Sequence, residues 1–439
     1  MIQIKNNLRT LIMKKRNKKI LGWSEREISQ FLIWDYIENF NKIKYYNTQD
    51  FLSDRYKTFT QKYKRYKFAL DFLDSFFLKL YLKNKKEEKR ILFQNIKYSE
   101  IILETKKYYS PFLMANGKER LFALKNRIGY LGIDNLYQYV YNYLIGKDIK
   151  YLYQLNQEVE KRLKLLRPNY IVLWNDVLPI ERATILASRK LGITTLEIQH
   201  GIYQSNYPLI NGRVADYILV WGQSFKDLYI KKGARKSEEI YILGYPHLIE
   251  KPGLNQRKKR DYTVYYLGQN FEDFNKELIN INLKTVNVLN KICTNLGIKF
   301  IYRPHPGENV IALKKKLLNI SFAADKEDLI ETINNGDIFI SFNSTALIEA
   351  AMRSKVCLQL VNYPLDTDNF ERLGVCTKSF RTIKALEEYL VKIINLPDLN
   401  NFKPKFNNNY INISYNPGQR FLEILDILDK NNRDNEKNY

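Results

Sequence analysis

The three histidines of this chain all lie in short loops that contain glycine or proline, and each loop directly follows an apolar run. They are His200, His247 and His305. The apolar runs have the length and composition of buried strands, so we expect the rings at strand carboxyl ends. In an open α/β sheet those ends border the ligand crevice, and histidine is suited to proton transfer near neutral pH. His247 follows Gly244 and Pro246 at a predicted hinge, and we interpret it as structural.

One stretch of the chain combines a basic loop with a polar helix start. The run Ile298–Tyr302 ends at the sequence RPHPG, whose two prolines and glycine stop a strand. The run Ile338–Phe342 ends at Asn343-Ser344-Thr345, and the following residues favour a helix capped by Asn343 or Ser344. The N–H groups at a helix start favour an anionic ligand. The stretch therefore predicts a phosphate site.

The elements that must position these loops alternate between strands and helices. Strands are expected at 91–93, 170–174, 194–198, 215–220, 240–243, 263–267, 298–302 and 338–342, and helices at 136–166, 179–191, 273–296, 346–352, 386–396 and 418–428. Residues 117–134 are expected to form a loop with short elements. The alternation predicts an α/β fold with parallel sheets, and 439 residues suffice for two domains. The charged connector Glu250–Asp261 would separate a domain at 91–250 from one at 262–428.

The first ninety residues form a basic extension with helix-compatible spacing at Glu27–Phe40 and Phe68–Leu82. They hold 22 Lys and Arg against 10 Asp and Glu, with no proline and one glycine. Two interpretations stay open for this extension. It packs on the domain behind it, or it meets an anionic lipid surface with Lys and Arg outward and Tyr, Phe and Leu inward.

Composition limits the class of protein. A net charge of +24 indicates an anionic partner, which is a nucleic acid, an acidic lipid surface or a phosphorylated substrate. A helix-turn-helix, an RRM and a zinc pattern are all missing from the sequence, which disfavours nucleic acid. Three cysteines are too few for a disulfide framework and favour a reducing compartment. Without a membrane-span or signal-peptide pattern, we expect a cytoplasmic protein, or one bound peripherally at the inner face of the plasma membrane.

The chain resembles the inverting GT-B glycosyltransferases of bacterial surface-polysaccharide synthesis through the motifs IQHG, VWG, GYPH, YRPHPGE and SFNSTALIEAA. More narrowly, it resembles capsule-synthesis and polysialyltransferase-like enzymes and the related CDP-glycerol glycerophosphotransferases. The resemblance covers roughly residues 91–428 and is strongest at 170–360. It implies two Rossmann-like β/α/β domains facing a central cleft, with the acceptor domain at 91–250 and the nucleotide-sugar donor domain at 262–428.

The resemblance also implies roles for individual residues. His305 would contact the donor phosphate, Ser344 and Thr345 would hold that phosphate, and Glu349 would bind the ribose. His200 resembles the general base of the glycerophosphotransferase branch, with Asp176 and then Glu181 as further candidates for the base. The donor site predicted in this way consists of Arg303, His305, Ser344, Thr345, Glu349 and Gly268.

The implied activity is transfer of a sugar from a nucleotide-activated donor, with a CMP-sugar favoured, to a surface glycan or a lipid-linked acceptor. No metal or cofactor is expected, because Arg303, His305 and Ser344 can neutralise the leaving phosphate. Asp366-Thr367-Asp368 has the spacing of a metal motif, but it follows Pro364 and we interpret it as a solvated turn. Two alternatives stay open: a polyol-phosphate transferase of the CDP-glycerol type, and a GT-B-fold nucleotide-sugar 2-epimerase, which would act without an acceptor.

Overall fold

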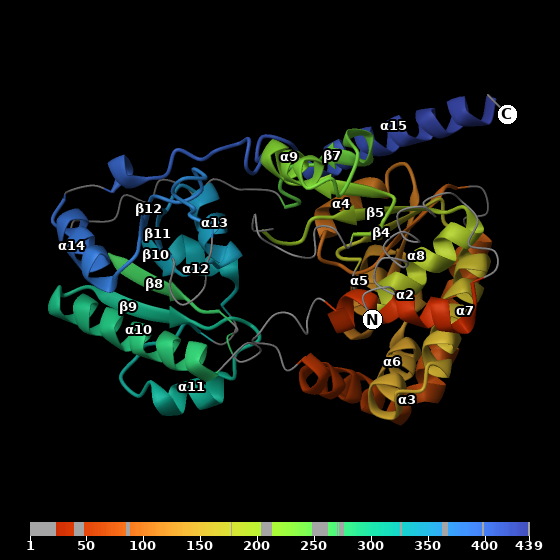
Figure 1. Cartoon of the computed structure of the whole chain (residues 1–439), viewed down its shortest axis with the longest axis horizontal. Coiled ribbons are helices and arrows are strands. Elements are labelled where there is room, and N and C mark those ends of the chain that lie inside the picture. The colour runs from red at the N-terminus through yellow and green to blue at the C-terminus, as the bar shows by residue number, and fades with distance from the viewer. Residues whose placement is uncertain are drawn as a thin grey trace.

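The computed structural model places the chain in two lobes, each built around its own parallel sheet (Figure 1). The structure describes residues 23–38, 48–84, 88–176, 178–202, 213–247, 262–269, 271, 276–324, 327–361, 368–396 and 399–437. The predicted connector Glu250–Asp261 lies outside the described residues, as do Asp366 and Thr367 of the predicted turn.

The first sheet has seven parallel strands in the order β3-β2-β1-β4-β5-β6-β7. The strands are β1 (Arg90–Phe93), β2 (Ser110–Ala115), β3 (Gly129–Gly132), β4 (Tyr170–Leu173), β5 (Thr194–Ile198), β6 (Tyr217–Val220) and β7 (Ile240–Ile242). Most of their residues are buried, because helices cover both faces of a parallel sheet. These strands are therefore continuous apolar runs rather than alternating ones.

Eight α-helices precede the second sheet in the described chain. They are α2 (Glu25–Glu38), α3 (Thr48–Asn84), α4 (Ser99–Thr105), α5 (Gly117–Asn126), α6 (Asp134–Gly146), α7 (Lys150–Leu166), α8 (Pro179–Leu191) and α9 (Gln223–Lys231), with a short 3₁₀ helix at Ser237–Glu239. Helix α8 has proline at its first position and ends at Gly192, whose φ of 68° is left-handed. Its bounds and those of β5 match the sequence prediction.

The second sheet has five parallel strands in the order β12-β11-β10-β8-β9. Its strands are β8 (Thr263–Leu267), β9 (Lys299–Arg303), β10 (Ile338–Ser341), β11 (Val356–Leu360) and β12 (Lys378–Phe380), and its helices are α10 (Lys276–Asn295), α11 (Val310–Lys316), α12 (Leu329–Asn335), α13 (Thr345–Met352) and α14 (Ile383–Ile394). A 3₁₀ helix at Asn400–Phe402 follows. The predicted α/β architecture with two parallel, Rossmann-like sheets is confirmed.

The last helix, α15 (Pro417–Lys437), returns to the first lobe (Figure 1). Its buried side chains Phe421, Ile424, Leu425 and Leu428 belong to the apolar cluster around β1 and α4. The sequence grouped residues 418–428 with the second domain, whereas the structure packs them on the first sheet. The reason is physical: the apolar stripe of α15 packs beside α4 and is removed from water there.

Strand β2 contains a proline, and the sequence analysis did not predict it. Pro111 pairs in register with Ile91 of β1, but the pairing of β2 with β3 begins only at Phe112, opposite Gly129. Pro111 therefore lies beyond the end of β3, where a missing N–H group costs the ladder little. All six residues of the strand are buried.

The two described helices of the basic extension pack against the first lobe. Helix α2 contacts α7 and α8, and α3 contacts α6 and β3. Buried residues on their inner sides, including Phe31, Leu32 and Leu78, join the core cluster of that lobe. Among the helices that the structure describes, none combines the length and the apolar character needed to cross a membrane.

Candidate functional site

The carboxyl end of the second sheet carries the basic loop that the sequence singled out. Strand β9 ends at Arg303, whose carbonyl accepts a hydrogen bond from the Gly268 N–H at 2.8 Å. A β-carbon at Gly268 would lie 2.4 Å from Glu308 Oε2 and 2.7 Å from the Tyr302 hydroxyl. Only glycine therefore allows the loop after β8 to approach the loop after β9 this closely.

Glu308 fixes the shape of the basic loop, a role that the sequence analysis missed. Its carboxylate accepts hydrogen bonds from the Tyr302 hydroxyl at 2.7 Å and from the His305 backbone N–H at 2.6 Å. The glutamate of the sequence RPHPGE was visible, but its partners depend on the fold of the loop. This clamp holds the exposed ring of His305 at the end of the sheet.

The His305 ring is held in one tautomer when it is neutral. Its Nδ1 accepts a hydrogen bond from the Gly307 N–H at 3.0 Å, so the proton of the neutral ring is on Nε2. Partial burial and the nearby Arg303 guanidinium lower the pKa of His305. Near neutral pH the residue is therefore an uncharged donor through Nε2–H.

Arg303 is half-buried beside this ring. Its Nε donates to the Thr332 hydroxyl at 2.9 Å, which orients the guanidinium. Burial lowers the pKa of Arg303, and the nearby carboxylates of Glu327 and Glu349 oppose that effect. Arginine stays charged under these conditions, so the site keeps a fixed cation.

Helix α13 begins after β10, which β8 separates from β9 in the sheet. Ser344 is its N-cap, and its hydroxyl accepts a hydrogen bond from the Ala346 N–H at 3.3 Å. Thr345 is the first helical residue and is half-buried. The Gln269 and Asn343 side chains are hydrogen-bonded to each other across the neighbouring strand ends. The N-terminus of α13 and the basic loop therefore lie at the same edge of the sheet, on either side of the end of β8.

Glu349 on α13 links the second domain to the first. It accepts a hydrogen bond from the buried Tyr245 hydroxyl, and it interacts electrostatically with Lys97 and Arg303. Tyr245 follows β7 and Lys97 follows β1, so both belong to the carboxyl edge of the first sheet. Glu349 is half-exposed at this junction. The two strand edges therefore face one another across Glu349.

His200 lies on the first-domain side of this junction. Its ring contacts Trp174 edge to face, with centroids 5.2 Å apart, and its carbonyl accepts from Lys97 Nζ at 3.0 Å. The same ammonium lies 5.5 Å from the centroid of the Trp174 ring. Burial, Arg213 and Lys97 lower the pKa of His200 well below its ordinary value. The ring is therefore neutral at physiological pH, and the lowered pKa makes it a weaker base than an ordinary histidine.

A carboxylate–imidazole pair, which the sequence did not predict, also lies in the first domain. His247 Nδ1 is 3.4 Å from Glu100 Oε2, and its ring contacts those of Tyr98 and Tyr245. Partial burial tends to raise the pKa of Glu100, but hydrogen bonds from His247 and the backbone outweigh it and lower the pKa overall. Both side chains are about one-third exposed. The pair therefore joins an ionised carboxylate to an imidazole at the edge of the junction.

Asp176, a candidate base in the sequence analysis, lies in a different environment. Its carboxylate is fully buried and accepts hydrogen bonds from Arg213 Nη1 at 3.2 Å and from the Ala215 and Val214 N–H groups. Arg213 also pairs with the buried Glu197 at 2.7 Å. Glu181, the third candidate, is buried and hydrogen-bonded to Gln94. These contacts hold the carboxylates of Asp176 and Glu181 in place within the first lobe, where they stabilise the fold.

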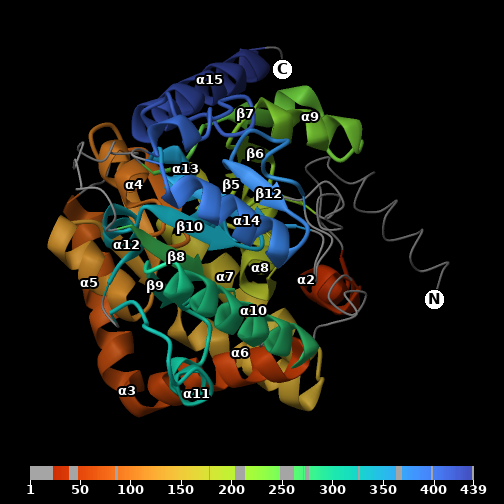
Figure 2. The same cartoon turned by 90° about the vertical axis from the view of Figure 1, so that its left-hand side faces the viewer.

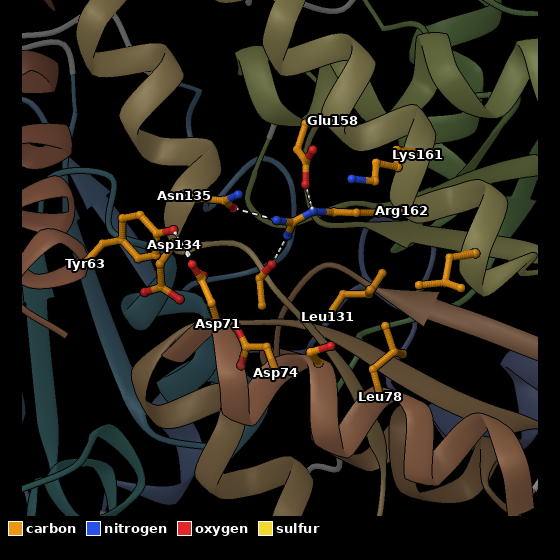
Figure 3. Close-up of a pocket in the computed structure, with 13 residues that line it drawn as sticks. Tyr63, Asp71, Asp74, Leu78, Leu131, Asp134, Asn135, Glu158, Lys161 and Arg162 are labelled. Atoms are coloured by element: carbon orange, nitrogen blue, oxygen red, sulfur yellow. Dashed lines mark hydrogen bonds and ion pairs between the residues drawn. The ribbon is translucent and has the colours of Figure 1, made fainter. Parts of the chain in front are cut away.

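The described residues also line a cavity of about 520 Å³ that includes none of the residues at this junction (Figure 3). It lies between α3, β3, α6 and α7, and hydrogen bonds or ion pairs hold its acidic side chains. Arg162 bonds Glu158 at 2.9 Å and Asn135 at 2.7 Å, and Asp74 pairs with Arg120 at 2.7 Å. The cavity belongs to the contact of α3 with the first lobe, and we assign it no chemistry.

Among the residues that the structure describes, no three His, Cys, Asp or Glu side chains gather in a group able to hold a metal ion. Of the predicted turn at 366–368, only Asp368 is described, and its carbonyl accepts from Gln359 Nε2 at 3.0 Å. The three cysteines are buried and free.

The burial of His200 gives the stability of the protein a pH dependence. In the unfolded chain the ring has its ordinary pKa of 6.5, and in the folded chain the pKa is far lower. Below a pH of about 6.5 the unfolded state binds a proton that the folded state does not, so stability falls with pH by up to ~1.4 kcal/mol per unit.

We therefore expect His200→Gln to lose less stability than the parent chain when the pH is lowered through this range. Urea unfolding at a series of pH values measures the difference. Equal pH slopes for the two proteins would show that the His200 ring titrates normally in the folded state.

No family model matches this sequence, and no curated protein matches it. Solved structures do share its fold. The structure of Staphylococcus aureus MnaA with UDP has a TM-score of 0.55 and 14% identity, covering 78% of this chain and 97% of that one. The UDP-GlcNAc 2-epimerase of Methanocaldococcus jannaschii, in complex with UDP-GlcNAc and UDP, has a TM-score of 0.52 and 16% identity, covering 77% and 99%. The Neisseria meningitidis UDP-GlcNAc 2-epimerase bound to UDP-GlcNAc has a TM-score of 0.53 and 14% identity, covering 76% and 98%.

These likenesses establish the fold and correct one prediction. The GT-B arrangement of two facing Rossmann-like domains is confirmed. The glycosyltransferase activity predicted from the sequence, with its CMP-sugar donor, is wrong, because the similar structures include UDP-GlcNAc 2-epimerases. The motifs behind that prediction lie at the carboxyl ends of strands in both sheets and do not by themselves specify a transfer reaction. The chain has the GT-B fold of nucleotide-sugar enzymes.

Proposed function

We propose that this protein is a nucleotide-sugar 2-epimerase that binds a UDP-sugar between its two sheets and inverts the configuration at C2. The observation that carries the proposal is the junction at Glu349. There the loops of the donor-side sheet face Lys97 and Tyr245 of the first sheet. Similar structures have been solved with UDP or UDP-GlcNAc bound.

The second domain supplies the groups that suit a diphosphate. Arg303 is a fixed cation beside the His305 Nε2–H donor. The α13 N-terminus adds backbone N–H groups and the positive end of the helix dipole. Donors of this kind, held by Thr332, Glu308 and Ser344, favour a phosphate over a neutral ligand.

The first domain supplies groups that suit proton transfer. Inversion at C2 breaks a C–H bond and forms a new one on the opposite face, so the site needs a proton acceptor and a proton donor. Glu100 is ionised at neutral pH and is joined to His247. Neutral His200 lies next to Lys97, whose ammonium can balance negative charge on the substrate.

Incubation with UDP-GlcNAc alone in D₂O tests the proposal. An epimerase incorporates deuterium at C2 and forms the C2 epimer without any acceptor, and nuclear magnetic resonance detects both changes. UDP should also raise the melting temperature more than CMP, CDP or GDP, because binding to the folded state stabilises it. The proposal of epimerase activity fails if UDP stabilises the protein but no UDP-sugar in a panel exchanges its C2 hydrogen. The protein would then have only a nucleotide-binding site.

A further inference from the structure

An exposed apolar stripe runs along the outer side of α3. Phe68, Phe72, Phe76 and Leu80 are 88%, 62%, 52% and 47% exposed, respectively. Their four-residue spacing places them on one side of the helix. The rings of Phe72 and Phe76 stack with centroids 6.3 Å apart. An exposed apolar row of this length on a protein surface indicates an interaction site.

The same side of α3 is basic. Arg65 and Lys79 lie seven residues before and after Phe72, and Lys83 lies four residues after Lys79, so all three are on the side of the stripe. All three are exposed.

The two acidic side chains in this part of the helix are held by inner groups. Asp74 pairs with Arg120 at 2.7 Å, and Asp71 accepts from the buried Tyr63 hydroxyl at 3.0 Å. Exposed cations therefore flank the aromatic stripe, with the acids directed away from it.

The second lobe repeats this combination on α11 and the turn after it. Ile311 and Leu318 are 73% and 83% exposed, and Lys315 and Lys316 between them are exposed as well. Helices α3 and α11 both lie at the lower end of the molecule in Figures 1 and 2. The two views share their vertical axis, so the helices are at the same end. We call the stripe of α3 together with these four residues the basal surface.

We propose that the basal surface docks on an anionic lipid bilayer, with the phenylalanines of α3 entering the headgroup region. Aromatic side chains interleaved with Lys and Arg match an interfacial surface, because the rings leave water while the cations meet lipid phosphates. The patches belong to different lobes and share one end of the molecule, which suits an extended, flat partner. This inference is independent of the catalytic proposal, since no residue of the basal surface belongs to the junction at Glu349.

Vesicle sedimentation with the full chain tests this inference. The protein should bind vesicles that contain phosphatidylglycerol and bind poorly to those of phosphatidylcholine alone, and high salt should release it. The double variant Phe72→Ser, Phe76→Ser and the double variant Lys315→Glu, Lys316→Glu should each weaken binding by about tenfold or more. Melting temperatures close to that of the parent chain would show that each variant is folded.

A matched control is available on α9, which lies at the upper end in both views. Ile230, Lys231 and Lys232 are exposed there, and changing them to Ser, Glu and Glu should leave vesicle binding unchanged. The inference fails if the parent chain does not bind anionic vesicles. It also fails if the α9 control variant loses as much vesicle binding as the α3 variant. It also fails if the phenylalanine variant alters only a concentration-dependent self-association measured by analytical ultracentrifugation, because the stripe would then join two copies of the chain.

Discussion

Replacing Glu100 by Gln is expected to lower the rate of deuterium exchange at C2 of the UDP-sugar by about 10²–10⁴-fold, the usual contribution of a positioned acid or base. Glu100 lies 3.4 Å from His247 and is ionised at neutral pH, so it can take a proton, whereas a glutamine amide cannot. The substitution keeps the size of the side chain and most of its hydrogen-bonding capacity. The measurement is the exchange rate at saturating substrate, followed by nuclear magnetic resonance.

Two controls show whether a lower exchange rate reflects loss of the carboxylate of Glu100. UDP should stabilise the Glu100→Gln variant as it does the parent chain, because the proposed phosphate donors are in the other domain. Glu238→Gln, at a side chain that is 70% exposed in a 3₁₀ helix, should keep full activity. If Glu100→Gln exchanges C2 at more than a tenth of the parent rate, Glu100 does not transfer the proton. His200→Gln and His247→Gln then become the variants to measure.

Replacing Arg213 by Met is expected to cost about 3–5 kcal/mol of the free energy of unfolding. The guanidinium lies between two fully buried carboxylates, 3.2 Å from Asp176 and 2.7 Å from Glu197. Its removal leaves two like charges buried without their cation, and neither can reach water. Chemical denaturation measures the change.

A further variant separates the two effects of Arg213→Met, which are the loss of the balancing charge and the loss of packing. Adding Asp176→Asn and Glu197→Gln to Arg213→Met removes the uncompensated charges and should recover part of the stability. A matched exposed pair is Lys430 with Asp426, whose side chains are 67% and 62% exposed. Lys430→Met should change stability by less than about 0.5 kcal/mol. An Arg213→Met protein as stable as the parent would mean that the guanidinium does not stabilise this cluster.

The strands and several helix ends could be predicted from the sequence because local signals define them. The bounds of α8 follow from Pro179 at its start and Gly192 after its end, and β8 is a pure apolar run. Strand β2 was missed, because Pro111 argues against a strand unless its neighbour is known to start one residue later. The starting point of the neighbouring strand is known only from the folded sheet, and the sequence of this segment does not show it.

The residues of the candidate site also fall into two groups, those that local sequence signals predict and those that they do not. His200, Arg303 and Ser344 could be assigned to strand ends because each follows an apolar run directly. The Glu100–His247 pair joins residues 147 positions apart, and Arg213 lies 37 positions from Asp176. Spacing along the chain carries no information about such contacts. For the same reason the sequence could name Asp176 as a candidate base but could not reveal its buried partners, Arg213 and the Ala215 N–H group.

The return of α15 to the first lobe has a consequence for synthesis on the ribosome. The first sheet is translated long before Phe421 and Leu425, yet these side chains are fully buried against its face beside α4. Until they emerge, that apolar face stays open to water while the whole second domain is being made. A nascent chain of this kind cannot complete its first domain first, as is usual in co-translational folding. The first domain stays incomplete until α15 has been synthesised. During this time general chaperones can bind its uncovered apolar face.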